Sequence, residues 1–262
     1  MFRLRHFLTA LLPLFPLAAA AQAPAASPRY WPGDAGKVIA SPLGWDRGDL
    51  GRAGLVAAGA GLSFLWLDGE LRGSTGGTPG ELAAKTEFLG DGLFTAAAFG
   101  ALYAYGGARG RADISGAALA GLESWAVSGL IVGAGKAALR RERPGAGGPD
   151  GWRHVGGSFL FGDGPSFPSG HSAAAFSSAR VAAWYFRDSP AAPYLCYGLA
   201  SLVAWSRVND NEHWTSDAVV GAAVGYFTAG KILKLHEARR AGGAALLPVY
   251  GAGPGLTAVY RF

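Results

Sequence analysis

The apolar residues of this 262-residue chain gather into long runs, and the breaks between the runs are rich in glycine, proline and charged residues. Apolar runs of this length, bounded by such residues, favour helices over strands. The six predicted helices span approximately Leu50–Asp68, Gly92–Tyr105, Ile114–Glu142, Gly170–Phe186, Pro193–Arg207 and Thr215–Glu237. The pattern therefore predicts an all-α fold in which a six-helix bundle occupies residues 50–240.

The residues before and after the predicted bundle have different patterns. Residues 1–21 join basic side chains at Arg3 and Arg5 to a short apolar run and then to alanines, which is the pattern of a secretory signal peptide, with an uncleaved anchor as the alternative. Residues 22–49 are polar and contain several prolines, which predicts a linker or a surface arm. Residues 245–262 alternate around a glycine-rich turn, so we expect a short C-terminal β-hairpin there.

Composition narrows the class of protein without deciding it. Half of the residues are hydrophobic, but 16% are charged and the mean hydropathy is only +0.20, which lies between a soluble protein and one with many membrane spans. The net charge of +5 is small and the basic residues are scattered, so the charge does not indicate nucleic-acid binding. The single cysteine, Cys196, excludes an intramolecular disulfide.

Three polar clusters lie in the second half of the chain, each at an end of a predicted helix. They are Lys136-x6-Arg143-Pro144, Pro168-Ser169-Gly170-His171 and Ser206-Arg207-x5-His213-x3-Asp217. In an up-and-down bundle the four helix ends concerned meet on one face, so we expect the clusters to form one site. They supply the cations, imidazoles and carboxylate that phosphoryl transfer needs as clamps, nucleophile, proton donor and orienting group. The set includes no metal-ligand cluster, so we expect neither a metal ion nor another cofactor.

The clusters match the signature K-x6-RP, PSGH and SR-x5-H-x3-D at every specified position. Over a motif core at residues 114–229, the chain resembles the superfamily of type 2 phosphatidic acid phosphatases, bacterial class A acid phosphatases and vanadium-dependent haloperoxidases. The resemblance implies a helical bundle, and it implies a metal-independent phosphatase that hydrolyses its substrate through a phosphohistidine intermediate.

The resemblance also implies a role for each matched residue. His213 would be the nucleophile, Asp217 would orient and stabilise its imidazole, and His171 would protonate the leaving group and later deprotonate the attacking water. The phosphate would be bound by the charges of Lys136, Arg143 and Arg207, by the Ser169 hydroxyl and by the Gly170 backbone N–H. Taken singly, each residue has an ordinary structural explanation, and only the joint match favours a site.

The expected substrates are phosphomonoesters or the phosphates and pyrophosphates of lipids, and the expected partner is a membrane or its surface. A soluble periplasmic acid phosphatase of broad specificity is the main alternative. Two further alternatives are a vanadium-dependent haloperoxidase, because vanadate mimics phosphate, and a non-catalytic phospholipid-binding protein of the cell envelope. The haloperoxidases are usually much longer than this chain, and the intact His171, His213 and Asp217 argue against a non-catalytic protein.

The sequence leaves the relation to the membrane open. Several apolar stretches, such as Leu93–Tyr105, are shorter than the about 20 residues that a hydrocarbon core needs. A cleaved signal peptide would also start the mature chain outside, and three crossings would then place the site in the cytoplasm. In contrast, basic residues gather at the helix ends away from the predicted site, which indicates a site that faces outward. We expect an exported periplasmic domain on or partly in a membrane, with a polytopic membrane protein as the alternative.

Two other features bear on the site. Glu123 and Arg180 fall inside apolar helical runs, and we expect them to face outward or to pair with each other rather than to bind substrate. The glycine-rich segment Gly145–Ser166 joins the first two clusters. It is either a lid that contacts substrate or a solvated loop.

Overall fold

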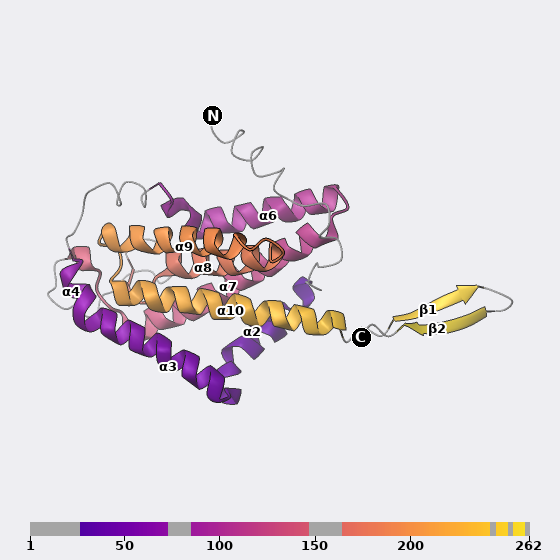
Figure 1. The fold of residues 1–262 in the computed structure, drawn as a ribbon, viewed down its shortest axis with the longest axis horizontal. Coiled ribbons are helices and arrows are strands. Elements are labelled where there is room, and N and C mark those ends of the chain that lie inside the picture. The colour runs from indigo at the N-terminus through magenta and orange to yellow at the C-terminus, as the bar shows by residue number, and fades with distance from the viewer. Residues whose placement is uncertain (1–26, 73–84, 147–163, 242–244, 251–253, 260–262) are drawn as a thin grey trace, which may run out of the picture.

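The computed structural model describes residues 27–72, 85–146, 164–241, 245–250 and 254–259. Within these residues the chain forms six long helices that overlap the six predicted segments (Figure 1). They are α3 (Arg47–Leu62), α6 (Gly92–Ala108), α7 (Ala112–Leu139), α8 (Gly170–Tyr185), α9 (Ala192–Asn209) and α10 (Thr215–Ala241). The all-α prediction is therefore confirmed. The predicted signal peptide and most of the predicted loop lie outside the described residues.

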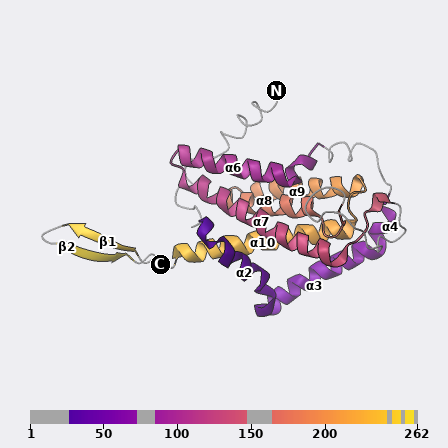
Figure 2. The same cartoon turned by 180° about the vertical axis from the view of Figure 1, so that it is seen from behind.

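Helix α8 is the centre of the bundle. It contacts α7, α9 and α10, and α6 packs against α7 on the outside (Figures 1 and 2). Many buried positions of α8 are alanine or serine, such as Ala174 and Ser177. Small side chains let the neighbouring helices approach closely, and larger apolar residues such as Val203 and Leu233 fill the remaining space.

Two glycines set how closely the segments of the three clusters approach one another. Gly221 of α10 lies against the backbone of Ser169, so a side chain at this position would collide with the Ser169 carbonyl oxygen. Gly135 of α7 lies against Pro168, where an added Cβ would be 2.7 Å from the proline Cδ. The turn that opens α8 is therefore held tightly between α7 and α10.

Helix α3 differs from the other long helices, because none of its residues is buried. It continues through a π-helical segment, Ser63–Leu67, into the short helix α4, Asp68–Glu70. Leu55 on the helix is 75% exposed, whereas the Asp68 side chain is buried. The apolar outer helix α3 is thus followed by a carboxylate, that of Asp68, which lies in the interior. π-Helical turns like the one that precedes Asp68 are frequent at functional sites.

The structure adds elements to those predicted. Helix α2 (Trp31–Ile39) lies within the predicted arm and packs against α7 and α10. Helix α7 ends earlier than predicted because Arg140 adopts a left-handed conformation with a φ of 48°. Short 3₁₀ helices are η3 (Pro28–Tyr30), η4 (Ser41–Gly44), η6 (Glu87–Gly90) and η7 (Pro144–Ala146). The predicted C-terminal hairpin is present, with β1 (Ala245–Tyr250) paired antiparallel to β2 (Pro254–Val259).

The prediction for the two charges inside apolar runs is wrong. Glu123 is fully buried, and its carboxylate contacts the His236 imidazole of α10. Arg180 is half-buried and donates to the hydroxyls of Tyr197 and Tyr226, at 3.4 and 3.3 Å. Glu123 and Arg180 do not pair with each other. Each lies on a helix face that a neighbouring helix covers, and the neighbouring helix supplies its polar partner.

Three described helical segments are long and apolar enough to cross a membrane, as judged by length and composition. They are Arg47–Glu70, Ala112–Ala146 and Thr215–Arg239. Large apolar side chains are also exposed around the bundle, and Leu93 of α6 and Tyr194 of α9 are 80% and 81% exposed. Others are Leu50, Leu55, Leu62, Tyr103, Leu195 and Leu199. An apolar surface of this extent is characteristic of a contact with lipid or with another protein.

Candidate active site

The structure brings the three predicted clusters together at one end of the bundle. Lys136 lies in the last turn of α7 and His171 in the first turn of α8. Arg207 lies in the last turn of α9, and Asp217 in the first turn of α10. Consecutive helices run in opposite directions, so all four helix ends share this face (Figure 1). The positive charges of Lys136, Arg143 and Arg207 all lower the pKa of the His171 imidazole, so the three cations act on the same group.

A third residue, Ser166, connects the side chains of His213 and Asp217, and the sequence analysis missed it. The His213 Nδ1 atom lies 3.8 Å from Asp217 Oδ2, which is too far for a direct hydrogen bond. The Ser166 hydroxyl lies 3.3 Å from Nδ1 and donates to Oδ2 at 2.5 Å. The Trp214 backbone N–H donates to the same oxygen at 3.1 Å. Because Nδ1 is turned to the carboxylate, Nε2 is the ring atom that can act on a substrate.

The His213 imidazole is held in its neutral form. Burial lowers its pKa to about 4, against the opposing effect of the Asp217 carboxylate. A neutral imidazole retains the lone pair that a nucleophile needs. His213 also lines a small hollow together with Arg72, Pro144 and Asn211.

The environment of His171 also favours the neutral imidazole before a substrate binds. Burial lowers the pKa of His171 to about 4, and the positive charges of Arg207, Arg143 and Lys136 act in the same direction. Asp91 opposes the shift. A bound phosphate would place negative charge among the same cations, and it would thereby raise this pKa toward the range in which an imidazole donates a proton.

In the structure the three cations contact oxygen atoms of the protein. Lys136 donates from Nζ to the Pro165 carbonyl, and Arg143 pairs with the Glu212 carboxylate. Arg207 pairs with the Glu87 carboxylate at 2.6 Å and lies 3.8 Å from that of Glu212. Both carboxylates are part-exposed, so they are the groups that a phosphate would have to displace. The sequence analysis did not single out either glutamate.

The two serines and the glycine of the signature have more local contacts. The Ser169 side chain caps α8, because its hydroxyl oxygen accepts from the Ser172 backbone N–H at 3.3 Å. Its own backbone N–H donates to the Asp217 carbonyl at 3.1 Å. Gly170 is the first residue of α8, where backbone N–H groups favour an anion. The Ser206 hydroxyl donates to the Val203 carbonyl within α9.

A second missed feature is a buried chain of charges behind Asp217. Arg141 is only 2% exposed, and its Nη1 donates to Asp217 Oδ1 at 2.7 Å. Its Nη2 donates to Asp68 Oδ2 at 2.8 Å, and the Ser216 hydroxyl bonds to both Arg141 and Asp68. The Asp217 carboxylate is thus connected through Arg141 to α4, at the end of the outer helix α3.

The comparisons with known proteins agree with this geometry. Residues 117–241 match the model of the PAP2 superfamily. The chain is also 44% identical to the lipid A 1-phosphatase of Porphyromonas gingivalis over 61 residues, which are 23% of this chain and 14% of that protein. The chain therefore spans only a small fraction of this relative's length. No solved structure gave a significant match.

Proposed function

We propose that the protein is a metal-independent phosphatase that removes phosphate from a lipid at a membrane. The observation that carries the proposal is that two neutral imidazoles, those of His171 and His213, lie at one end of the bundle. The same end carries three cationic side chains and the hydrogen-bonded carboxylate of Asp217. The match of residues 117–241 to the PAP2 superfamily supports the same activity. The cations provide the charge neutralisation that a metal ion supplies in other phosphatases.

The proposed reaction has two steps. In the first, His213 Nε2 attacks phosphorus, a nitrogen–phosphorus bond forms, and the bond from phosphorus to the leaving oxygen breaks as that oxygen takes a proton from His171. In the second, His171 takes a proton from water and the water oxygen bonds to phosphorus. The nitrogen–phosphorus bond breaks, which frees the His213 imidazole and inorganic phosphate. Asp217, acting with Ser166, stabilises the charge that develops on His213.

The residues proposed to bind phosphate are those of the signature. Lys136, Arg143 and Arg207 would neutralise the oxygens of the transferring group once Glu87 and Glu212 are displaced. The Gly170 N–H would add a neutral donor from the start of α8. We also assign a weak contribution to the Ser169 hydroxyl, because its oxygen already caps the helix.

A lipid substrate is favoured by two observations. The named relative is a lipid A 1-phosphatase, so the matched segment occurs in a protein that acts on a lipid phosphate. In addition, the outer helices expose large apolar side chains, including Leu55, Leu93 and Tyr194, and three described segments are long enough to span a bilayer. Of the two locations expected from the sequence, this surface favours the membrane-inserted one.

We propose that the site faces the outer side of that membrane. Arg109, Arg111 and Arg187 lie at helix ends opposite to the site, which is where cytoplasmic basic residues are found in membrane proteins. Helix α3 runs toward the site, so this orientation starts Arg47 on the cytoplasmic side if α3 crosses. Labelling of Arg109→Cys in a Cys196→Ser background tests the orientation: the new thiol should be protected from an impermeant reagent in intact cells, and its labelling would reverse the assignment.

Phosphate release from defined substrates tests the proposed activity. The purified full chain is assayed in detergent with EDTA on p-nitrophenyl phosphate, phosphatidic acid, lipid A and undecaprenyl pyrophosphate, with His213→Ala as the inactive variant. We expect EDTA-resistant release from at least one lipid that is lost in His213→Ala. Release only from p-nitrophenyl phosphate would indicate a broad-specificity phosphatase instead. Equal release by His213→Ala would contradict the proposal.

A further inference from the structure

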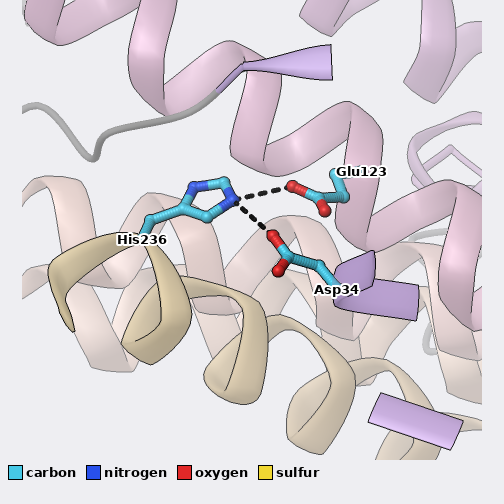
Figure 3. Close-up of side chains that lie close together, drawn as sticks. All are labelled: Asp34, Glu123 and His236. Atoms are coloured by element: carbon cyan, nitrogen blue, oxygen red, sulfur yellow. Dashed lines mark hydrogen bonds and ion pairs between the residues drawn. The ribbon is translucent and has the colours of Figure 1, made fainter. Parts of the chain in front are cut away.

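A second group of ionisable side chains is buried at the other end of the bundle from the candidate active site. It consists of Asp34 of α2, Glu123 of α7 and His236 of α10, and each side chain is at most 1% exposed. One ligand atom from each residue lies within 4.8 Å of the other two. Figure 3 shows the two carboxylates and the imidazole pointing toward one another. Along α10, His236 lies about 28 Å from Asp217, at about 1.5 Å per residue.

The contacts within this group have the geometry of ligands around one centre. The His236 Nε2 atom lies 2.7 Å from Glu123 Oε2 and 3.6 Å from Asp34 Oδ2. Atoms bound to one tetrahedral Zn²⁺ at about 2.0–2.2 Å lie about 3.4 Å apart. The contact between His236 and Glu123 would have to widen by about 0.7 Å for these two atoms to bind a common tetrahedral ion.

Internal hydrogen bonds do not satisfy all the polar atoms of this group. Glu123 Oε1 and His236 Nδ1 are buried, and neither has a hydrogen-bond partner. Val38, Val127 and Ile232, each four positions from one member of the group on the same helix, form a buried apolar cluster. A buried carboxylate with an unsatisfied oxygen is unfavourable in such surroundings. In Figure 3 both oxygens of Glu123 lie on the side of the side chain that faces the other two residues.

The local charge also favours a cation. Asp34 and Glu123 bring two negative charges, and Arg239 supplies one positive charge through a two-pronged contact with Asp34 at 2.8 and 2.5 Å. Arg239 uses one position on each oxygen of Asp34, and a carboxylate oxygen can accept a second contact. Ligating carboxylates are commonly held in this way by a hydrogen-bonding neighbour. A divalent ion would therefore complete the group rather than compete with Arg239.

We propose that Asp34, Glu123 and His236 bind a first-row divalent metal ion, such as Zn²⁺, that fastens α2 to α7 and α10. One imidazole nitrogen with two carboxylate oxygens suits Zn²⁺ and its neighbours, whereas Ca²⁺ and Mg²⁺ prefer sites made only of oxygen. The three ligands come from three separate helices, so the ion would hold α2 against the bundle. Its role would be structural, since the candidate active site is at the other end.

Metal binding by the full chain tests this proposal directly. The protein is purified in detergent, stripped with a chelator and titrated with Zn²⁺, and bound metal and the unfolding temperature are both measured. We expect one Zn²⁺ per chain and a higher unfolding temperature for the wild type. Glu123→Gln and His236→Asn should lose stoichiometric binding. Glu237→Gln is the matched control, because this exposed residue adjoins His236 but contacts Trp184 and Arg187 instead.

The outcomes separate this proposal from the proposed phosphatase activity. Absence of stoichiometric Zn²⁺ binding by the wild type would overturn the metal site, as would equal binding by wild type, Glu123→Gln and His236→Asn. Stronger binding of Mg²⁺ or Ca²⁺ than of Zn²⁺ would overturn the choice of metal class. The wild-type measurement needs no variant to fold, so unstable variants do not block the test. Phosphate release in EDTA is expected whether or not this site binds metal.

Discussion

Arg141 and Asp217 form a buried ion pair in which the Arg141 Nη1 donates to Asp217 Oδ1 at 2.7 Å. The other oxygen of Asp217 accepts from Ser166 and from the Trp214 backbone. The carboxylate therefore contacts donors on both oxygens, and its orientation toward His213 is set by the protein rather than by water. Asp68 fixes Arg141 from the opposite side at 2.8 Å.

Replacing Asp68 should slow the reaction without weakening substrate binding. Asp68→Asn keeps the size of the side chain but removes the charge that orients Arg141, so the Asp217–His213 geometry loosens. We expect kcat to fall by up to about 100-fold, with KM nearly unchanged because Asp68 is behind the site. Steady-state kinetics on the best lipid substrate measure both constants.

The control for this prediction is Asp49→Asn, since Asp49 is an exposed aspartate on α3 that pairs only with the exposed Arg52 among the described ion pairs. It should leave both constants unchanged. An effect of Asp68→Asn on KM alone would contradict a positioning role. Arg141→Met should be harsher, because it leaves two buried carboxylates without their cation, at a cost of about 3–5 kcal/mol.

Removing the Glu212 carboxylate should strengthen phosphate binding. Glu212 pairs with Arg143 and lies near Arg207, so it competes with the phosphate for both cations. We expect Glu212→Gln to lower the inhibition constant for vanadate up to about fivefold, which corresponds to the about 1 kcal/mol of a part-exposed ion pair. Inhibition of phosphate release measures this constant, with Glu237→Gln as a control far from the site. Weaker vanadate inhibition in Glu212→Gln would mean that Glu212 supports the cations instead.

The two histidines predict different pH dependences for kcat/KM and kcat. In the free protein the pKa values of His171 and His213 are both lowered to about 4. His213 is therefore a neutral nucleophile above about pH 4, whereas His171 loses the proton it must donate as the pH rises above that value. Bound phosphate raises the pKa of His171. We expect kcat to stay high to a higher pH than kcat/KM, and coincident profiles would contradict the role of His171.

The same shifts have a consequence for stability. Each imidazole has a lower pKa in the folded protein than its ordinary value of 6.5, so folding disfavours protonation. Their contribution to stability is complete above about pH 6.5, and it is lost as the pH falls toward 4. The unfolding temperature measured across this range should fall less steeply in His213→Ala than in the wild type.

Because Gly221 lies so close to Ser169, we expect one added methyl group at this position to lower the stability of the protein. A Cβ at this position meets the Ser169 carbonyl oxygen, which is backbone and cannot rotate away. We expect Gly221→Ala to lower stability by about 1–3 kcal/mol and to reduce phosphate release. Thermal unfolding measures the first effect. Gly100→Ala is the control, because no atom lies within 4 Å of an added Cβ on this α6 glycine, and unchanged stability in Gly221→Ala would contradict the packing account.

Much of the helical architecture could be predicted from the sequence, because long apolar runs mark the helices. Apolar runs bounded by glycine and proline gave the six helices, and opposite directions of consecutive helices placed the three clusters at one end. Helix α2 was missed because it is short and contains Pro32, Gly33 and Gly36, which are typical of a loop.

Contacts between distant residues were beyond the sequence patterns. Arg141 falls in the unspecified part of the first cluster, and its buried partner Asp68 follows a π-helical segment that no sequence pattern predicted. Ser166 lies outside the signature, two positions before Pro168. Glu123 was misjudged because its partner His236 is on a helix far along the chain, and no local pattern links the two.

The most direct test of the central claim is to identify the residue that carries phosphate during turnover. The protein is mixed with its best lipid substrate, quenched in base within milliseconds, and digested for mass spectrometry under conditions that preserve phosphohistidine. The account predicts phosphate on His213 that appears before free phosphate and is absent from His213→Ala. Phosphate on a different residue, or full turnover by His213→Ala, would contradict it.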